Sequence, residues 1–142
     1  MLETSLSKTQ NLLGAQHYFP RRMIKNFAMV APEDVRKMFI DLYNEHIPLS
    51  DRIYKFIKES DFILEKYKST WRNHFQDYRT ISTYLWLRYP ERYYIFKPRE
   101  FSRVSQILNT SYTFKKVLLP ILYCKHTNYI MKSNGFCNKI QN

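Results

Sequence analysis

Residues 32–43, PEDVRKMFIDLY, indicate the fold class more firmly than any other stretch of this chain. Apolar side chains recur there at i, i+3, i+4, i+7 and i+8, namely at Val35, Met38, Phe39, Leu42 and Tyr43. That spacing places all five on one face of an α-helix. Pro32 suits the first helical turn, and Glu33 and Asp34 are favourable near the positive end of a helix dipole, so we interpret this acidic pair as structural.

Similar patterns on both sides predict further helices. Pro20 suits the first turn of a helix over 20–30, in which Met23, Ile24 and Phe27 form one apolar face. Downstream, Ser50 is expected to cap a helix whose inward residues are Ile53, Phe56, Ile57, Ile63, Leu64 and Tyr67. A weaker pattern at Leu2, Leu6, Thr9 and Leu13 predicts a first helix that ends near Gly14.

The second half adds two helices and a short extended segment. Residues 69–77 are expected to form a connection between helices. The next helix, over 78–89, should end before Pro90, because proline disfavours helical geometry in the preceding residue. The aromatic and β-branched residues 93–97 predict a short strand. Pro98 should open a last helix whose buried stripe is Phe101, Val104, Ile107 and Leu108.

We therefore expect a mainly α fold, a compact helical domain of about six helices over residues 1–116, with at most one short strand or strand pair near 93–97. Residues 117–142 differ in character, because they contain no acidic residue, no helical stripe and both cysteines. We expect an irregular tail there, produced by a shifted reading frame or a truncation. Cys124, His126 and Cys137 supply fewer ligands than a structural zinc site needs, so no metal or cofactor is predicted.

The formal net charge of +11 predicts attraction to polyanions. Residues 71–116 carry nine basic and three acidic side chains, whereas residues 1–70 are nearly balanced. The longest apolar run, 117–123, is far shorter than the roughly 20 residues of a membrane-spanning helix. Because the N-terminus also lacks the pattern of a signal peptide, we expect a soluble, cytoplasmic protein without membrane contact.

The basic excess begins where aromatic residues gather, since six of the seventeen residues in 81–97 are aromatic. The pattern favours a core role for Tyr84, Leu85, Leu87, Tyr94 and Phe96, and it leaves Trp86, Tyr89 and Tyr93 open between core and surface. Single-strand binding proteins combine aromatic stacking with cations that meet phosphates. We therefore list as candidate nucleic-acid-binding residues Arg72, Arg79, Trp86, Arg88, Tyr89, Arg92, Lys97, Arg99 and Arg103.

Catalysis is not indicated by any pattern in the sequence. The four histidines are scattered, no Ser or Cys lies in a nucleophile elbow, and the phosphate-binding pattern GxxxxGK[ST] is absent. We expect a protein that is not an enzyme and that has no small-molecule substrate.

Several strings support a more specific expectation. TISTYLWLRYPERYYIFK, preceded by NHFQD and followed by YTFKK, resembles a helical N-terminal region of McrB-type AAA+ motor proteins of modification-dependent restriction systems. LSKTQNLL, FPRRMIKNFA and PEDVRKMFIDLY resemble the same region in the same order, so that the similarity covers about residues 2–116. The motor module itself is absent from this chain.

The resemblance implies a non-catalytic DNA-recognition or assembly module whose partners are DNA and a partner restriction subunit. Two alternatives stay open, namely a protein-interaction domain that binds an acidic partner subunit and a truncated remnant without activity. The DNA hypothesis rests on one premise, which is that the positive charges of 71–116 gather on a single outward surface.

Overall fold

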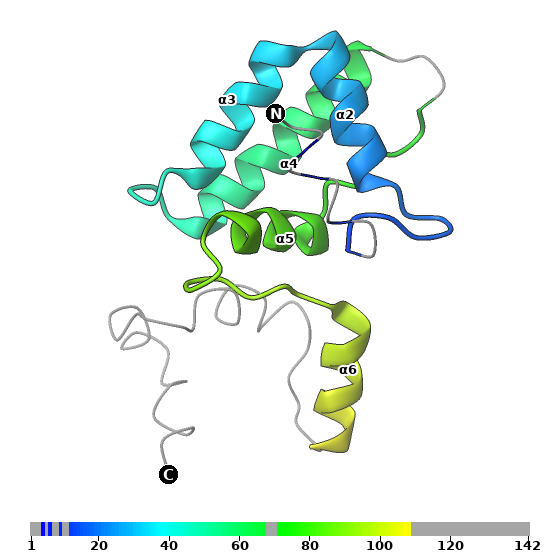
Figure 1. Cartoon of the computed structure of the whole chain (residues 1–142), viewed down its shortest axis with the longest axis vertical. Coiled ribbons are helices and arrows are strands. Elements are labelled where there is room, and N and C mark those ends of the chain that lie inside the picture. Colours follow the sequence, from blue (N-terminus) through cyan, green and yellow to red (C-terminus); the bar gives the residue numbers. More distant parts are fainter. Residues whose placement is uncertain (1–3, 5, 7–8, 10–11, 68–70, 109–142) are drawn as a thin grey trace.

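The computed structural model describes residues 4, 6, 9, 12–67 and 71–108, and this part is mainly helical (Figure 1). Its helices are α2 (Pro20–Val30), α3 (Pro32–Tyr43), α4 (Leu49–Lys66), α5 (Tyr78–Arg88) and α6 (Pro98–Ile107). No strand is formed within these described ranges. The first predicted helix falls mostly outside the described residues, and the predicted tail 117–142 lies outside them entirely.

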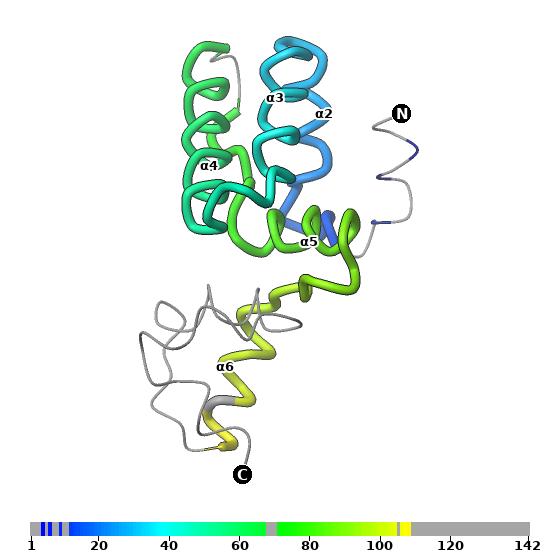
Figure 2. The backbone as a smooth tube through the Cα atoms, turned by 90° about the vertical axis from the view of Figure 1, so that its left-hand side faces the viewer, coloured from blue at the N-terminus to red at the C-terminus, as the bar shows by residue number. Residues whose placement is uncertain are grey.

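Four of the helices form one body. α2, α3 and α4 lie alongside one another, α5 lies across their lower ends, and α6 extends away from them (Figures 1 and 2). Pro20, Pro32 and Pro98 each occupy the first turn of a helix, as predicted. Proline is tolerated there because its missing N–H would have no partner within the helix.

The start of α4 differs from expectation, whereas α5 begins at Tyr78, as predicted. α4 begins at Leu49, and the Ser50 hydroxyl donates to the carboxylate of Asp51 at 3.1 Å, so the prediction that Ser50 caps this helix is wrong. α5 is instead capped by Asp77, whose Oδ1 accepts a hydrogen bond from the Thr80 N–H at 3.0 Å. The Asp77 cap fixes where α5 starts.

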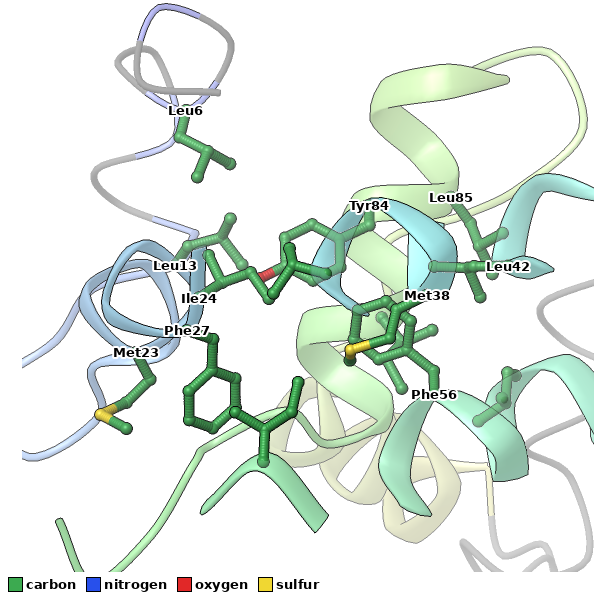
Figure 3. Close-up of a cluster of buried hydrophobic side chains, with 14 of the residues drawn as sticks. Leu6, Leu13, Met23, Ile24, Phe27, Met38, Leu42, Phe56, Tyr84 and Leu85 are labelled. Atoms are coloured by element: carbon green, nitrogen blue, oxygen red, sulfur yellow. The ribbon is translucent and has the colours of Figure 1, made fainter. Parts of the chain in front are cut away.

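The core lies between α5 and the three helices α2, α3 and α4 (Figure 3). Tyr84 lies at the centre of this core and is 1% exposed. The centroid of its ring lies 5.1 Å from that of Phe39 and 6.0 Å from that of Phe56. Its hydroxyl donates to Gln76 Oε1 at 2.9 Å. Burial raises the pKa of Tyr84 well above its usual value, as expected for a phenol removed from water. The predicted core roles of Tyr84, Leu85 and Phe96 are confirmed.

The strand expected at 93–97 is not formed. The segment has no regular secondary structure, and one of its backbone groups bonds to a side chain of α5, since the Phe96 N–H donates to Ser82 Oγ at 2.9 Å. Tyr93 and Phe96 are buried, whereas Tyr94 is 42% exposed. The aromatic residues of this segment therefore anchor a connection against helices, and the core prediction for Tyr94 is wrong.

The buried stripe predicted for α6 is also wrong. Phe101 packs against Phe96 with ring centroids 5.9 Å apart, but Val104, Ile107 and Leu108 are 52%, 73% and 64% exposed. The reason is that α6 extends away from the body formed by the other four helices (Figure 2). Leu87, near the end of α5, is likewise exposed at 41% instead of buried.

Candidate nucleic-acid interface

Two arginines meet one tyrosine where α5 ends. The guanidinium carbons of Arg88 and Arg92 lie 5.2 Å and 5.9 Å from the centroid of the Tyr89 ring. The chain turns back here, because the N–H groups of Arg92 and Tyr93 both donate to the Tyr89 carbonyl oxygen, at 3.0 Å and 3.1 Å. We call Arg88, Tyr89 and Arg92 the basic–aromatic cluster.

The Tyr89 ring is held from the side of the core. It meets the ring of Tyr43 edge to face at 6.1 Å and that of Tyr93 at 6.2 Å. Cation–π contacts with two guanidinium groups stabilise this arrangement by about 0.5–1 kcal/mol each at an exposed site. Since the ring already contacts two cations, the cluster is better suited to arginine–phosphate contacts than to stacking of a base on Tyr89.

Arg92 also belongs to an ion pair. Its Nη1 binds Glu45 Oε2, and its Nε lies 3.9 Å from Glu91 Oε1. Both arginines are exposed, Arg92 with 54% of its side chain. Within the part of the chain that the structure describes, Arg88 forms no ion pair. The cluster thus presents one partly neutralised and one unneutralised guanidinium group.

Behind Glu45 lies a buried cation. The Tyr93 hydroxyl donates to Glu45 Oε1 at 3.0 Å and accepts from Arg52 Nη2 at 3.2 Å. Arg52 is 1% exposed, and its Nη1 donates to the Leu42 carbonyl oxygen at 2.8 Å. Burial raises the pKa of Tyr93, and the hydrogen bond from Arg52 opposes that rise. A chain of contacts therefore connects the core at Arg52 with Arg92 at the surface.

Other candidates from the sequence lie apart from the cluster. Arg79 sits at the opposite end of α5, where its guanidinium carbon is 4.7 Å from the Tyr18 ring centroid. Arg79 and Arg88 are separated by about 14 Å along the helix, at 1.5 Å per residue. Arg72 is exposed in the connection before α5. Trp86 is half-buried and lies on the other side of α5 from Arg88, because residues two apart differ by about 200°.

The remaining candidates belong to the projecting helix. Lys97 is the N-cap residue of α6, and Arg99 and Arg103 follow four residues apart, so the two arginines share one helix face. All three are exposed. Within the described part of 71–116, the positive charges therefore do not gather on a single outward surface, and that premise of the DNA hypothesis is wrong. Arg88 and Arg92 lie at the end of α5, a second group lies on α6, and Arg72 and Arg79 lie elsewhere.

Reasoning from sequence missed the roles of Glu45 and Arg52 and two cation–π pairs on α4. Glu45 and Arg52 carry no local signal, because their contacts with Arg92 and Tyr93 join positions 41 to 48 residues apart. On α4, Lys58 and Lys66 lie over the exposed rings of Tyr54 and Phe62, at 5.7 Å and 5.8 Å. The i, i+4 spacing of these pairs was visible in the sequence. α4 also carries four acidic residues, so this face is not a cationic one.

The described ranges offer neither a metal site of clustered side chains nor a membrane-spanning helix. No group of three or more His, Cys, Asp or Glu side chains there could hold a metal ion. No helix there has the length and apolar character to cross a bilayer.

Comparison of the chain with protein-family models, with curated proteins and with solved structures gave no match.

Proposed function

We propose that this chain is a non-catalytic DNA-recognition or assembly module that grips phosphate groups through the basic–aromatic cluster and the arginines of α6. The observation that carries the proposal is that Arg88 and Arg92 are both exposed and that both guanidinium groups lie against the Tyr89 ring, where the chain turns. The net charge of +11 and the resemblance to McrB-type N-terminal regions agree with it.

Contacts of this kind position a protein on DNA without reading its sequence. Arginine binds phosphate through charge-assisted hydrogen bonds, which are the stronger class of hydrogen bond in proteins. Phosphates carry no sequence information, so the proposed surface should bind unrelated DNA sequences with similar affinity.

The experiment compares two double variants with the same loss of charge. Arg88→Gln/Arg92→Gln should weaken binding to several unrelated DNA duplexes by roughly tenfold, equivalent to about 1.4 kcal/mol. Arg36→Gln/Lys37→Gln removes two exposed charges from α3 and should have a clearly smaller effect. Fluorescence anisotropy at low salt provides the affinities. Equal losses in the two variants would reduce DNA binding to a property of net charge and would contradict a role for the cluster.

A protein-interaction function is the second candidate, favoured by α6. This helix exposes Val104 and Ile107 together with Arg99 and Arg103, and its C-cap residue Leu108 is also exposed. The arrangement is suited to an acidic partner with an apolar groove. If the cluster variant leaves DNA binding unchanged while Ile107→Asp abolishes capture of a partner subunit, the interaction function replaces the DNA function.

A further inference from the structure

Glu45 occupies an unusual position for an acidic residue beside a cationic surface. It lies in the short connection between α3 and α4, where the Ile47 N–H donates to the Asn44 carbonyl oxygen at 3.2 Å. The His46 N–H donates to Asn44 Oδ1 at 3.2 Å. This turn directs Glu45 toward residues almost fifty positions later in the chain, namely Arg92 and Tyr93.

The two carboxylate oxygens of Glu45 contact different partners. Oε1 accepts the hydrogen bond from the Tyr93 hydroxyl, which is tied in turn to the buried Arg52. Oε2 binds Arg92 Nη1. The first contact faces the interior, whereas the second lies in solvent, where 54% of the Arg92 side chain is exposed. The Tyr93 contact can therefore keep Glu45 in place even when Arg92 is released.

A carboxylate and a phosphate compete for the same guanidinium groups, because both are planar or tetrahedral oxyanions that accept parallel hydrogen bonds from arginine. Exposed ion pairs contribute little to stability, so the Arg92–Glu45 pair can be exchanged for another anion at small cost. The hydrogen bond between Glu45 and Tyr93 is harder to replace than the Arg92 pair, because Tyr93 and Arg52 are buried.

We infer that Glu45 is an internal competitor of phosphate for Arg92, which lowers the affinity of the basic–aromatic cluster for polyanions. Glu45 holds Arg92 in the unbound protein, and a phosphate group takes its place when nucleic acid binds. This inference rests on the proposed function, since it assigns a regulatory role to a residue of the same surface.

The inference predicts that removing the charge of Glu45 raises the affinity of the protein for DNA. Glu45→Gln keeps the length of the side chain and an oxygen that can accept from Tyr93, but it removes the charge that holds Arg92. Its affinity for a DNA duplex should rise at least threefold above that of Glu33→Gln, which makes the same change of charge at an exposed site on α3. Glu45→Ala is the second variant, used if Glu45→Gln changes the circular dichroism spectrum.

A double-variant cycle identifies the mechanism. In an Arg92→Gln background, Glu45→Gln should give no more affinity than Glu33→Gln, because the competed guanidinium is gone. A gain that persists without Arg92, or no gain above Glu33→Gln in the parent chain, would overturn the inference. If Arg88→Gln/Arg92→Gln still weakens binding in that case, the proposed function stands. If the parent chain shows no binding to DNA at low salt, both the proposed function and this inference are contradicted.

Discussion

Tyr84→Ala should lower the free energy of unfolding by roughly 3–5 kcal/mol, the usual cost of deleting a large buried aromatic side chain. Tyr84 is 1% exposed, and its ring contacts those of Phe39 and Phe56 from two different helices. The substitution would leave a cavity at the junction of α3, α4 and α5, and Gln76 Oε1 would lose its donor. Urea denaturation followed by circular dichroism gives the change in free energy.

Two control variants separate the ring from the hydroxyl and from general effects of substitution. Tyr84→Phe keeps the ring and should cost about 1–2 kcal/mol through the lost hydrogen bond to Gln76. Tyr54→Ala removes an aromatic residue that is 64% exposed on α4 and should change stability by no more than about 0.5 kcal/mol. A loss below about 1 kcal/mol for Tyr84→Ala would mean that the site does not form the centre of the core.

Arg52→Met should lower the free energy of unfolding by roughly 2–4 kcal/mol, because hydrogen bonds from a charged group contribute about 1.5–3 kcal/mol each. Arg52 is buried and donates to the Leu42 carbonyl oxygen and to the Tyr93 hydroxyl. Methionine fills much of the same volume but donates to neither. Leu42 and Tyr93 would then each lose a buried partner.

The measurement is again urea denaturation, with Lys55→Met as the matched control. Lys55 lies on the same helix and is exposed, with its Nζ 2.8 Å from Asp41 Oδ2. Loss of this pair should cost less than loss of Arg52, because Lys55 itself is exposed to solvent. Equal stability of Arg52→Met and the parent chain would show that the buried cation is not needed. The hydrophobic replacement would then offset the lost hydrogen bonds, as happens for some buried ion pairs.

The helices of this protein were predictable because their signals are local. α2 has the predicted bounds Pro20–Val30, and α5 ends just before Tyr89, which precedes Pro90. Proline in a first turn, proline after a last turn and the i, i+3, i+4 recurrence of apolar residues all act within a few positions. These signals do not depend on how the chain folds at longer range.

The surface was less predictable, because it depends on contacts between distant segments. The spacing of Phe101, Val104, Ile107 and Leu108 is that of a buried stripe, yet α6 leaves the body and exposes three of them. Neighbouring cations in the sequence also separate in space, since Arg79 and Arg88 occupy opposite ends of α5. Conversely, the approach of Glu45 to Arg92 joins positions 47 residues apart.

The most direct test of phosphate recognition is the dependence of DNA affinity on salt. The logarithm of the binding constant should fall linearly with the logarithm of salt concentration, by about 0.9 for each phosphate neutralised. If Arg88, Arg92, Arg99 and Arg103 all contact phosphates, a slope of about −3 to −4 is predicted. Arg88→Gln/Arg92→Gln should make that slope shallower by about two. A parent affinity that does not change with salt, or a slope that the double variant leaves unchanged, would contradict DNA binding through this surface.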